Sequence, residues 1–130
     1  MKYLLDVNAL IAFGLIHHQF HGRVNSWVQS QHDPRLFSCS ITELGFVRIA
    51  AQAPLYGFTV EQARNLLLQL KKNPPLPLEF ITDGNDIAFV PPWVKTPGQT
   101  TDGHLAQLAR SNGAVLATFD RGIPGVLQIP

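Results

Sequence analysis

The sequence contains a single cysteine, Cys39, so it cannot form an internal disulfide. We expect Cys39 to be a small buried residue in a protein of a reducing compartment. Long apolar runs are also missing. The leucine-rich N-terminus is broken by Asp6 and Asn8, and no segment reaches the roughly 18 apolar residues that span a bilayer. We therefore expect a cytoplasmic protein with neither a membrane span nor a secretory signal.

Charge is scarce as well, since only 15% of the residues are charged and the formal net charge is +1. This balance argues neither for nor against a nucleic-acid partner. If several acids were neutralised by divalent cations, however, the remaining surface would be positive and would attract phosphate. The hydrophobic fraction of 45% predicts a large core and an apolar surface reserved for a partner.

The chain of 130 residues is long enough to bury its own core, and we expect a single domain over residues 1–130. Short apolar segments alternate with amphipathic ones of helical period. This alternation predicts a three-layer α/β domain with a mostly parallel central sheet flanked by helices. The expected strands lie at 2–6, 36–39, 76–81, 114–119 and 126–129, and the expected helices at 8–16, 20–32, 40–53, 59–73 and 100–113.

Local patterns predict where several of these helices begin and end. Asn8 suits the cap of the first helix, and Ser40-x-x-Glu43 and Thr59-x-x-Gln62 have the spacing of capping boxes. Asn73-Pro74-Pro75 should close the helix that Thr59 opens. Two further expectations concern apolar residues: Leu44, Val47 and Ala51 share one face of their helix, and residues 87–90 form a short buried segment.

Four acids occupy equivalent places in the alternation. Asp6 and Asp120 end apolar strands, whereas Glu43 and Asp102 fall in the first turn of a helix. In a parallel sheet these positions share one edge, so the four carboxylates can converge there. Crowded carboxylates repel unless a cation lies between them, and an all-oxygen ligand set suits Mg²⁺ or Mn²⁺. The pattern predicts phosphodiester hydrolysis by a metal-activated water.

The stretches around these acids resemble the four acidic motifs of PIN-domain nucleases, and most closely those of VapC-type toxins from bacterial toxin–antitoxin systems. They occur in the family's order over nearly the whole chain, at 4–8, 41–48, 101–105 and 116–122. One departure is that Arg121 and Gly122 follow Asp120, where many relatives carry a further acid. Four ordered motifs are far more specific than any one of them.

The resemblance implies a PIN-like (Rossmann-like) sheet and Mg²⁺-dependent endoribonuclease activity. It also implies a homodimer and a small VapB-type antitoxin whose tail enters the site. Within this chain it makes Asp6, Glu43, Asp102 and Asp120 the metal ligands. The residues that orient them would be Asn8, Ser40 and Thr118.

Helix faces with more apolar residues than one core requires give the antitoxin a possible docking surface. A partner helix could lie in a groove formed by these faces. The residues concerned are Leu44, Val47, Leu66, Leu67 and Leu70.

Two other functions remain open at this point. A chain that kept the fold and lost the chemistry would be a binding module. Phosphatases of the haloacid dehalogenase type also begin with a strand that ends in Asp, but the second acid of their motif is replaced here by Asn8. Each acid taken alone could equally be a helix cap or a turn residue.

Polar residues outside the motifs are also open to two interpretations. Arg48 and Arg121 are candidates for contact with RNA phosphates, although either could form an ordinary ion pair. The remaining candidates are expected to be surface, turn or core residues: His17, His21, Asp83, Asp86 and Trp27.

Overall fold

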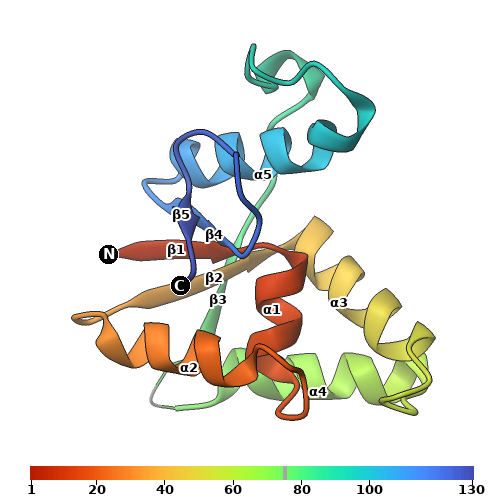
Figure 1. Cartoon of the computed structure of the whole chain (residues 1–130). Helices are drawn as coiled ribbons and strands as arrows, with labels where there is room; N and C mark the ends of the chain where they lie inside the picture. The colour runs from red at the N-terminus through yellow and green to blue at the C-terminus, as the bar shows by residue number, and fades with distance from the viewer. Residues whose placement is uncertain (75) are drawn as a thin grey trace.

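The computed structural model describes residues 1–74 and 76–130, which form a parallel sheet with helices on both faces (Figure 1). The strands are β1 (Lys2–Leu5), β2 (Arg35–Cys39), β3 (Leu78–Ile81), β4 (Val115–Thr118) and β5 (Leu127–Gln128). The helices are α1 (Val7–Gly14), α2 (His21–Ser30), α3 (Ser40–Gln52), α4 (Val60–Lys72) and α5 (Thr100–Ser111). Two 3-10 turns, η1 (Ile87–Phe89) and η2 (Pro97–Gln99), precede α5.

Strand β1 is the centre of the sheet, whose order is β3-β2-β1-β4-β5. It pairs in parallel with β2 and β4, so that Leu4 lies opposite Phe37 on one side and Leu116 on the other. A central parallel strand is buried on both faces, which explains its continuous apolar sequence. The pairing brings the carboxyl ends of β1, β2 and β4 to one edge, from which α1, α3 and the loop after β4 begin.

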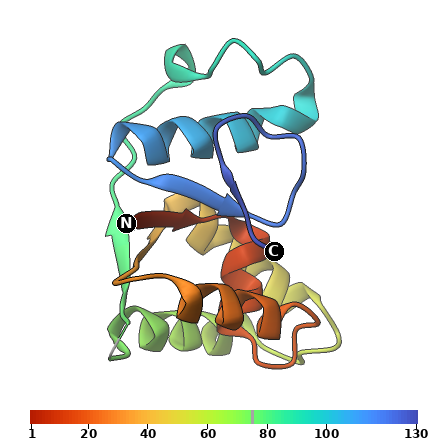
Figure 2. The same cartoon turned by 60° about the vertical axis from the view of Figure 1, so that its left-hand side comes forward.

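Alternate residues of β1 contribute to two separate cores. Tyr3 and Leu5 belong to the core on the α1–α4 side, whereas Leu4 packs with Leu105 and Leu108 of α5. Figure 2 shows α5 and the long segment before it on one face of the sheet and the other helices on the opposite face. The predicted three-layer α/β fold is therefore confirmed.

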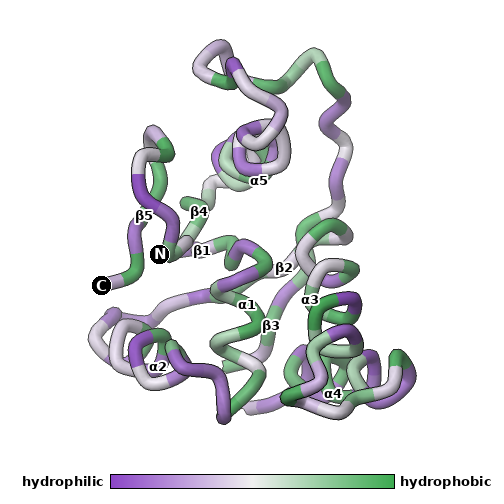
Figure 3. The backbone as a smooth tube through the Cα atoms, turned by 45° about the vertical axis from the view of Figure 1, so that its right-hand side comes forward, coloured by the Kyte–Doolittle hydropathy of each residue, from purple (hydrophilic) through white to green (hydrophobic). Residues whose placement is uncertain are grey.

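Hydropathy along the helices follows the same layers. Figure 3 shows hydrophobic and hydrophilic residues alternating along α3 and α4, as expected for helices with one buried face. Trp27 of α2 is buried against Tyr3, as predicted, with the two ring centroids 4.8 Å apart. In the described part of the chain, every helix is too short or too polar to cross a membrane.

Two helices begin at residues other than those predicted. The cap of α1 is Asp6 rather than Asn8, because the Asp6 carboxylate accepts a hydrogen bond of 2.8 Å from the Ala9 N–H. Ser40 is already helical in α3, so the predicted Ser40–Glu43 capping box is wrong.

The cap of α3 is made one residue earlier. The hydroxyl oxygen of Thr42 accepts a 3.0 Å hydrogen bond from the Cys39 N–H, and Cys39 is buried as expected. Because Thr42 forms the cap with Cys39, the Glu43 carboxylate is not used in capping and can bind elsewhere. The Thr59–Gln62 capping box of α4 is confirmed.

Leu44 is 72% exposed, whereas α3 buries Phe46 and Ala50. One segment that was predicted to be buried faces solvent. The segment expected to be buried at 87–90 contains η1, and Ile87 is 80% exposed. At the end of α4, Asn73 is the C-cap as its sequence predicts, whereas Pro75 lies outside the described residues.

Candidate functional site

Asp6 is the most buried acid of the predicted set, with 4% of its surface exposed at the end of β1. Its two carboxylate oxygens have different partners. One accepts the Ala9 N–H at 2.8 Å, and the other accepts a short hydrogen bond from the hydroxyl of Thr118 at the end of β4. The two neighbouring strands therefore fix the orientation of this carboxylate.

Burial raises the pKa of Asp6 from its ordinary value of 3.8 to about 6. The hydrogen bonds from Thr118 and Ala9 oppose this shift, while the charges of Asp120 and Asp102 add to it. The repulsion between two carboxylates weakens with distance, so Asp6, Asp102 and Asp120 lie near one another and form one electrostatic neighbourhood.

Asp102 and Asp120 complete this neighbourhood from two other elements. Asp102 lies half-buried in the first turn of α5, and burial together with the Asp120 charge raises its pKa. Asp120 is exposed just beyond β4, where its backbone N–H donates to the Thr118 hydroxyl oxygen at 3.0 Å. Thr118 thus connects Asp6 to Asp120 and has the orienting position that the resemblance implies.

Glu43 is held in a different way. Its Oε2 accepts a hydrogen bond of 2.5 Å from the Ser38 hydroxyl and forms an ion pair of 2.9 Å with the Lys71 ammonium. Ser38 is fully buried in β2, and Lys71 comes from the last turn of α4. The sequence analysis missed both partners, although a buried serine within an apolar strand was a visible signal.

The other proposed orienting residues contact none of the acids through the hydrogen bonds of the described residues. Asn8 is exposed on α1, and Ser40 is exposed at the start of α3. The hydroxyl that orients Glu43 is Ser38 rather than Ser40. The prediction missed this because the Ser-x-x-Glu pattern suggested the wrong serine.

The arginines and histidines fall into two groups. Arg48 and Arg121 are exposed, and neither forms a salt bridge among the residues that the structure describes. His21 is tied to the fold, since its ring bonds to the Ala12 carbonyl at 2.7 Å and to Asn25 at 2.9 Å. The sequence predicted a surface histidine, whereas the ring is half-buried and held by these bonds.

Both loop aspartates make turns, as predicted. Asp83 accepts a hydrogen bond from the Asn85 N–H at 3.0 Å, and Asp86 caps η1 through the Ala88 N–H at 2.9 Å. Asp83 has an additional bond that the sequence did not suggest, to Nε2 of His104 in α5. This bond fastens the segment before α5 to the helix that carries Asp102.

The donor set fits a hard divalent cation in chemistry, although the described residues contain no ready-made cluster of three metal-ligating side chains. Carboxylate oxygens are the ligands that Mg²⁺ and Mn²⁺ prefer. The salt bridges of the described residues do not reach Asp6, and burial together with the charges of Asp120 and Asp102 raises its pKa, so a cation beside it would offset both the cost of burying its charge and the repulsion.

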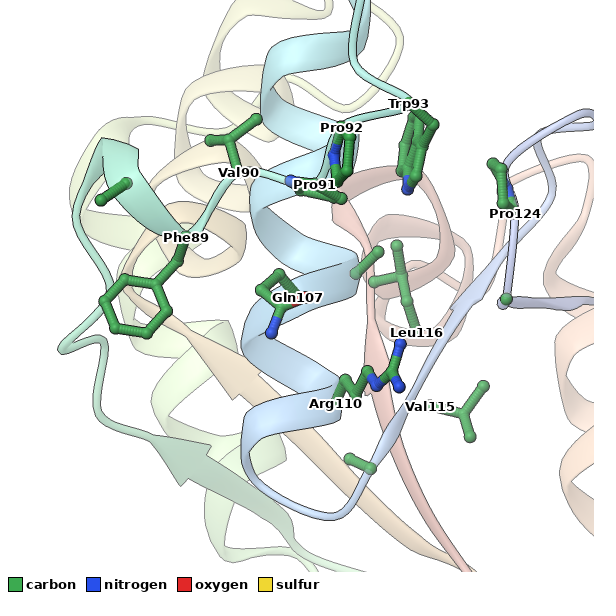
Figure 4. A pocket seen from close by; sticks show the side chains of 14 residues that line it. Phe89, Val90, Pro91, Pro92, Trp93, Gln107, Arg110, Val115, Leu116 and Pro124 are labelled. Carbon is green, nitrogen blue, oxygen red and sulfur yellow. The ribbon is translucent and has the colours of Figure 1, made fainter.

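A cavity of about 700 Å³ lies between α5, the segment before it and β4, and none of the four acids is among its lining residues. Figure 4 shows Gln107 and Arg110 projecting from α5, with Trp93 and Pro124 at one end of the cavity. The cavity combines aromatic, apolar and cationic groups.

Comparison with known proteins identifies relatives over almost the full length of the chain. It is 34% identical over 125 residues to Ribonuclease VapC38 of Mycobacterium tuberculosis, covering 92% of this chain and 86% of the relative. It is 33% identical over 129 residues to Ribonuclease VapC44 of the same organism, covering 95% and 89%. A comparison with models of known protein families found no match.

Solved structures with little sequence identity share the fold. VapC20 of Mycobacterium tuberculosis, a sarcin–ricin loop cleaving toxin, gives a TM-score of 0.63 at 12% identity, covering 98% of this chain and 99% of the other. FitAcB from Neisseria gonorrhoeae gives 0.59 at 24% identity, covering 98% and 96%. VapBC2 from Rickettsia felis, bound to promoter DNA, gives 0.60 at 17%, covering 98% and 97%.

The parallel sheet, its two helical layers and these structural neighbours define a PIN-like domain. The identities of the full-length relatives are more specific. The chain belongs to the VapC ribonuclease family, the PIN-domain toxins of toxin–antitoxin systems. This membership replaces the phosphatase alternative and confirms the family that the four motifs predicted.

Proposed function

We propose that this chain is a divalent-metal-dependent endoribonuclease that acts as the toxin of a toxin–antitoxin pair. Its cation would be held by Asp6, Asp102 and Asp120, with Glu43 as a fourth ligand. The observation that carries the proposal is the arrangement at the ends of β1 and β4, where the buried Asp6 carboxylate is hydrogen-bonded to Thr118 and Thr118 to the backbone of Asp120. Family membership supplies the reaction class, since the relatives are ribonucleases.

The cation would neutralise charge on the phosphate and make a bound water more acidic. The residues of this chain have separate tasks. Thr118 and the Ala9 N–H hold the Asp6 carboxylate in one orientation, so that little reorganisation is needed when substrate arrives. Asp120 is exposed, and its carboxylate can accept the proton that the attacking water loses.

The cavity beside α5 offers a path for the RNA strand. Trp93 is half-buried and Phe89 half-exposed, so both present ring surface on which a base can stack. Arg110 lies in the same cavity and can contact a phosphate, and Arg121 is exposed directly after Asp120. Single-stranded RNA fits this combination better than a duplex, whose bases are already stacked.

The direct test is RNA cleavage by the purified chain in Mg²⁺ and in EDTA, for wild type, Asp6→Asn and Asp33→Asn. Asp33 is an exposed loop residue with a positive φ of 49°, which Asn also adopts, so it is a matched control. We expect Mg²⁺-dependent cleavage by wild type and Asp33→Asn and none by Asp6→Asn. Full activity of Asp6→Asn would contradict the role given to Asp6, and no cleavage by wild type would favour the inactive binding module.

A small antitoxin protein is the proposed partner, because three structural neighbours are described as VapBC or FitAB proteins. The predicted docking surface is divided in the structure. Leu44, Val47 and Leu67 line a groove of about 480 Å³ next to Glu43, together with the half-exposed Phe80. Leu66 lines a second apolar pocket with Leu55, at the far end of α1.

The first groove suits the partner better, because Glu43, one of the proposed metal ligands, lines it. We expect Leu44→Glu to abolish capture of the neighbour-encoded antitoxin in a pull-down, and Leu55→Glu to leave capture intact. The reverse pattern would move the antitoxin to the second pocket. The homodimer implied by the resemblance is part of the same proposal, and sedimentation of the free chain tests it.

A further inference from the structure

Lys71 gives one of the four acids a counter-cation of its own. Its ammonium lies 2.9 Å from Oε2 of Glu43, and the same oxygen accepts the 2.5 Å hydrogen bond from Ser38. Both side chains are shielded, with 25% of Lys71 and 21% of Glu43 exposed. An ion pair in this position is weakened less by solvent than a fully exposed one.

The position of Lys71 is set by more than the ion pair. Its ammonium also lies 4.8 Å from the centre of the Phe80 ring in β3, a distance typical of a cation–π contact. Lys71 of α4 therefore contacts both Phe80 of β3 and Glu43 of α3. Lys72, the next residue, is exposed and makes no salt bridge within the described chain.

The four acids are thus in two electrostatic states. Asp6, Asp102 and Asp120 act on one another as like charges, and the salt bridges of the described residues reach none of them. Glu43 alone is compensated, by Lys71 on the side of α4. A divalent cation attracted by the three aspartates would therefore compete with the lysine for the fourth carboxylate.

We propose that Lys71 is a resident counter-cation of Glu43, which a divalent metal ion must displace before Glu43 can join the metal ligands. Lys71 thereby lowers the metal affinity of the free protein and makes recruitment of Glu43 a separate step. The inference rests on the proposed function, because it needs the cation site. It concerns affinity and the order of ligand binding rather than the reaction itself.

Calorimetric titration with Mn²⁺ tests the affinity for wild type, Lys71→Gln, Lys71→Arg, Lys72→Gln and Asp6→Asn. Removing the ammonium frees Glu43 and removes a repelling charge, so Lys71→Gln should bind Mn²⁺ at least about threefold more tightly. Lys71→Arg keeps the charge and should bind like wild type. Lys72→Gln makes the same charge change without the Glu43 contact and should have a smaller effect.

A double-mutant cycle tests the exchange without any activity measurement. Lys71→Gln, Glu43→Gln and the double variant are unfolded in EDTA and in saturating Mg²⁺, with the melts also showing that each variant folds. The coupling between the two residues should be present in EDTA and should shrink in Mg²⁺, because Glu43 leaves the ammonium.

The outcomes separate the two proposals. If wild type binds Mn²⁺ and Asp6→Asn does not, the cation site stands. In that case, unchanged or weaker binding by Lys71→Gln, or a coupling that is equal in EDTA and Mg²⁺, overturns the role of Lys71 alone. If neither wild type nor Lys71→Gln binds Mn²⁺, both the cation site and the counter-cation are wrong.

Discussion

The hydroxyl of Thr118 donates a hydrogen bond to the carboxylate of Asp6, although the two residues are 112 positions apart in the sequence. The same hydroxyl oxygen accepts the backbone N–H of Asp120 at 3.0 Å. The contact exists because β1 and β4 are adjacent parallel strands that end at the same edge of the sheet. One buried threonine therefore sets the geometry between two of the proposed metal ligands.

Thr118→Val should lower the free energy of unfolding by about 1–3 kcal/mol, because it keeps the shape but leaves the buried carboxylate of Asp6 and the backbone N–H of Asp120 without their partner. It should also raise the pKa of Asp6 further, since the hydrogen bond from Thr118 lowers it. Urea unfolding in EDTA measures the first effect. Thr118→Ser retains the hydroxyl and should stay close to wild type; equal stability of the valine variant would contradict the account.

Asp6→Asn should stabilise the metal-free protein at neutral pH. The folded-state pKa of about 6 lies above the ordinary value of 3.8, so the folded protein holds its proton to higher pH than the unfolded chain. The stability that protonated Asp6 contributes is complete below the ordinary pKa of 3.8 and is lost as the pH rises through the folded-state pKa of about 6. It amounts to about 3 kcal/mol at most.

The measurement is the free energy of unfolding in EDTA at several pH values from about 4 to 7, for wild type and Asp6→Asn. Other groups titrate in both proteins, so the difference between the two curves isolates Asp6. The variant should gain on the wild type as the pH rises. Parallel curves would show that Asp6 is not strained by its burial.

Gly45 allows α3 to approach α1 closely. A Cβ added there would lie 2.6 Å from Cγ2 of Val7, immediately after Asp6. Gly45→Ala should therefore destabilise the fold by about 1–3 kcal/mol and shift Val7 and the neighbouring Asp6. Gly22→Ala is the matched control in α2, where the new methyl group meets nothing within 4 Å and should stabilise the helix slightly. Thermal melts of both variants compare the two effects.

RNA binding can be separated from cleavage in the Asp6→Asn background. Arg110→Gln should weaken binding of a short single-stranded RNA by about three- to tenfold, because it removes a cation from the cavity beside α5. Lys72→Gln removes an equal charge outside this cavity and should change the affinity less. Trp93 also reports on the site, since Trp27 is buried and Trp93 fluorescence should fall when a base stacks on it. An unchanged affinity and fluorescence would place the RNA elsewhere.

The positions of Asp6, Thr118 and Asp120 were predictable because they depend on short-range sequence patterns. Each stands at the end of a short apolar strand, and parallel pairing then places the strand ends at one edge. Asp102 was predictable for a similar reason, as the first-turn acid of a helix with a clear apolar stripe. These same positions carry the family resemblance that the full-length relatives confirm.

The surroundings of Glu43 were not predictable in the same way. The ion pair with Lys71 depends on how α4 crosses α3, which the periodicity of each helix does not determine. The sequence pointed to Ser40 rather than Ser38 as the partner of Glu43, because Ser40 has the spacing of a capping box with Glu43. In the structure, Cys39 and Thr42 form the cap of α3, and Ser38 donates to Glu43.

The central claim is that the carboxylate of Asp6 supports RNA cleavage. The most direct measurement is to map new RNA 5′ ends in cells after brief induction of wild type, Asp6→Asn or Asp33→Asn. We expect growth arrest and discrete new 5′ ends with wild type and Asp33→Asn, and neither effect with Asp6→Asn at equal protein level. The same cleavage pattern with Asp6→Asn, or no new ends with wild type, would contradict it.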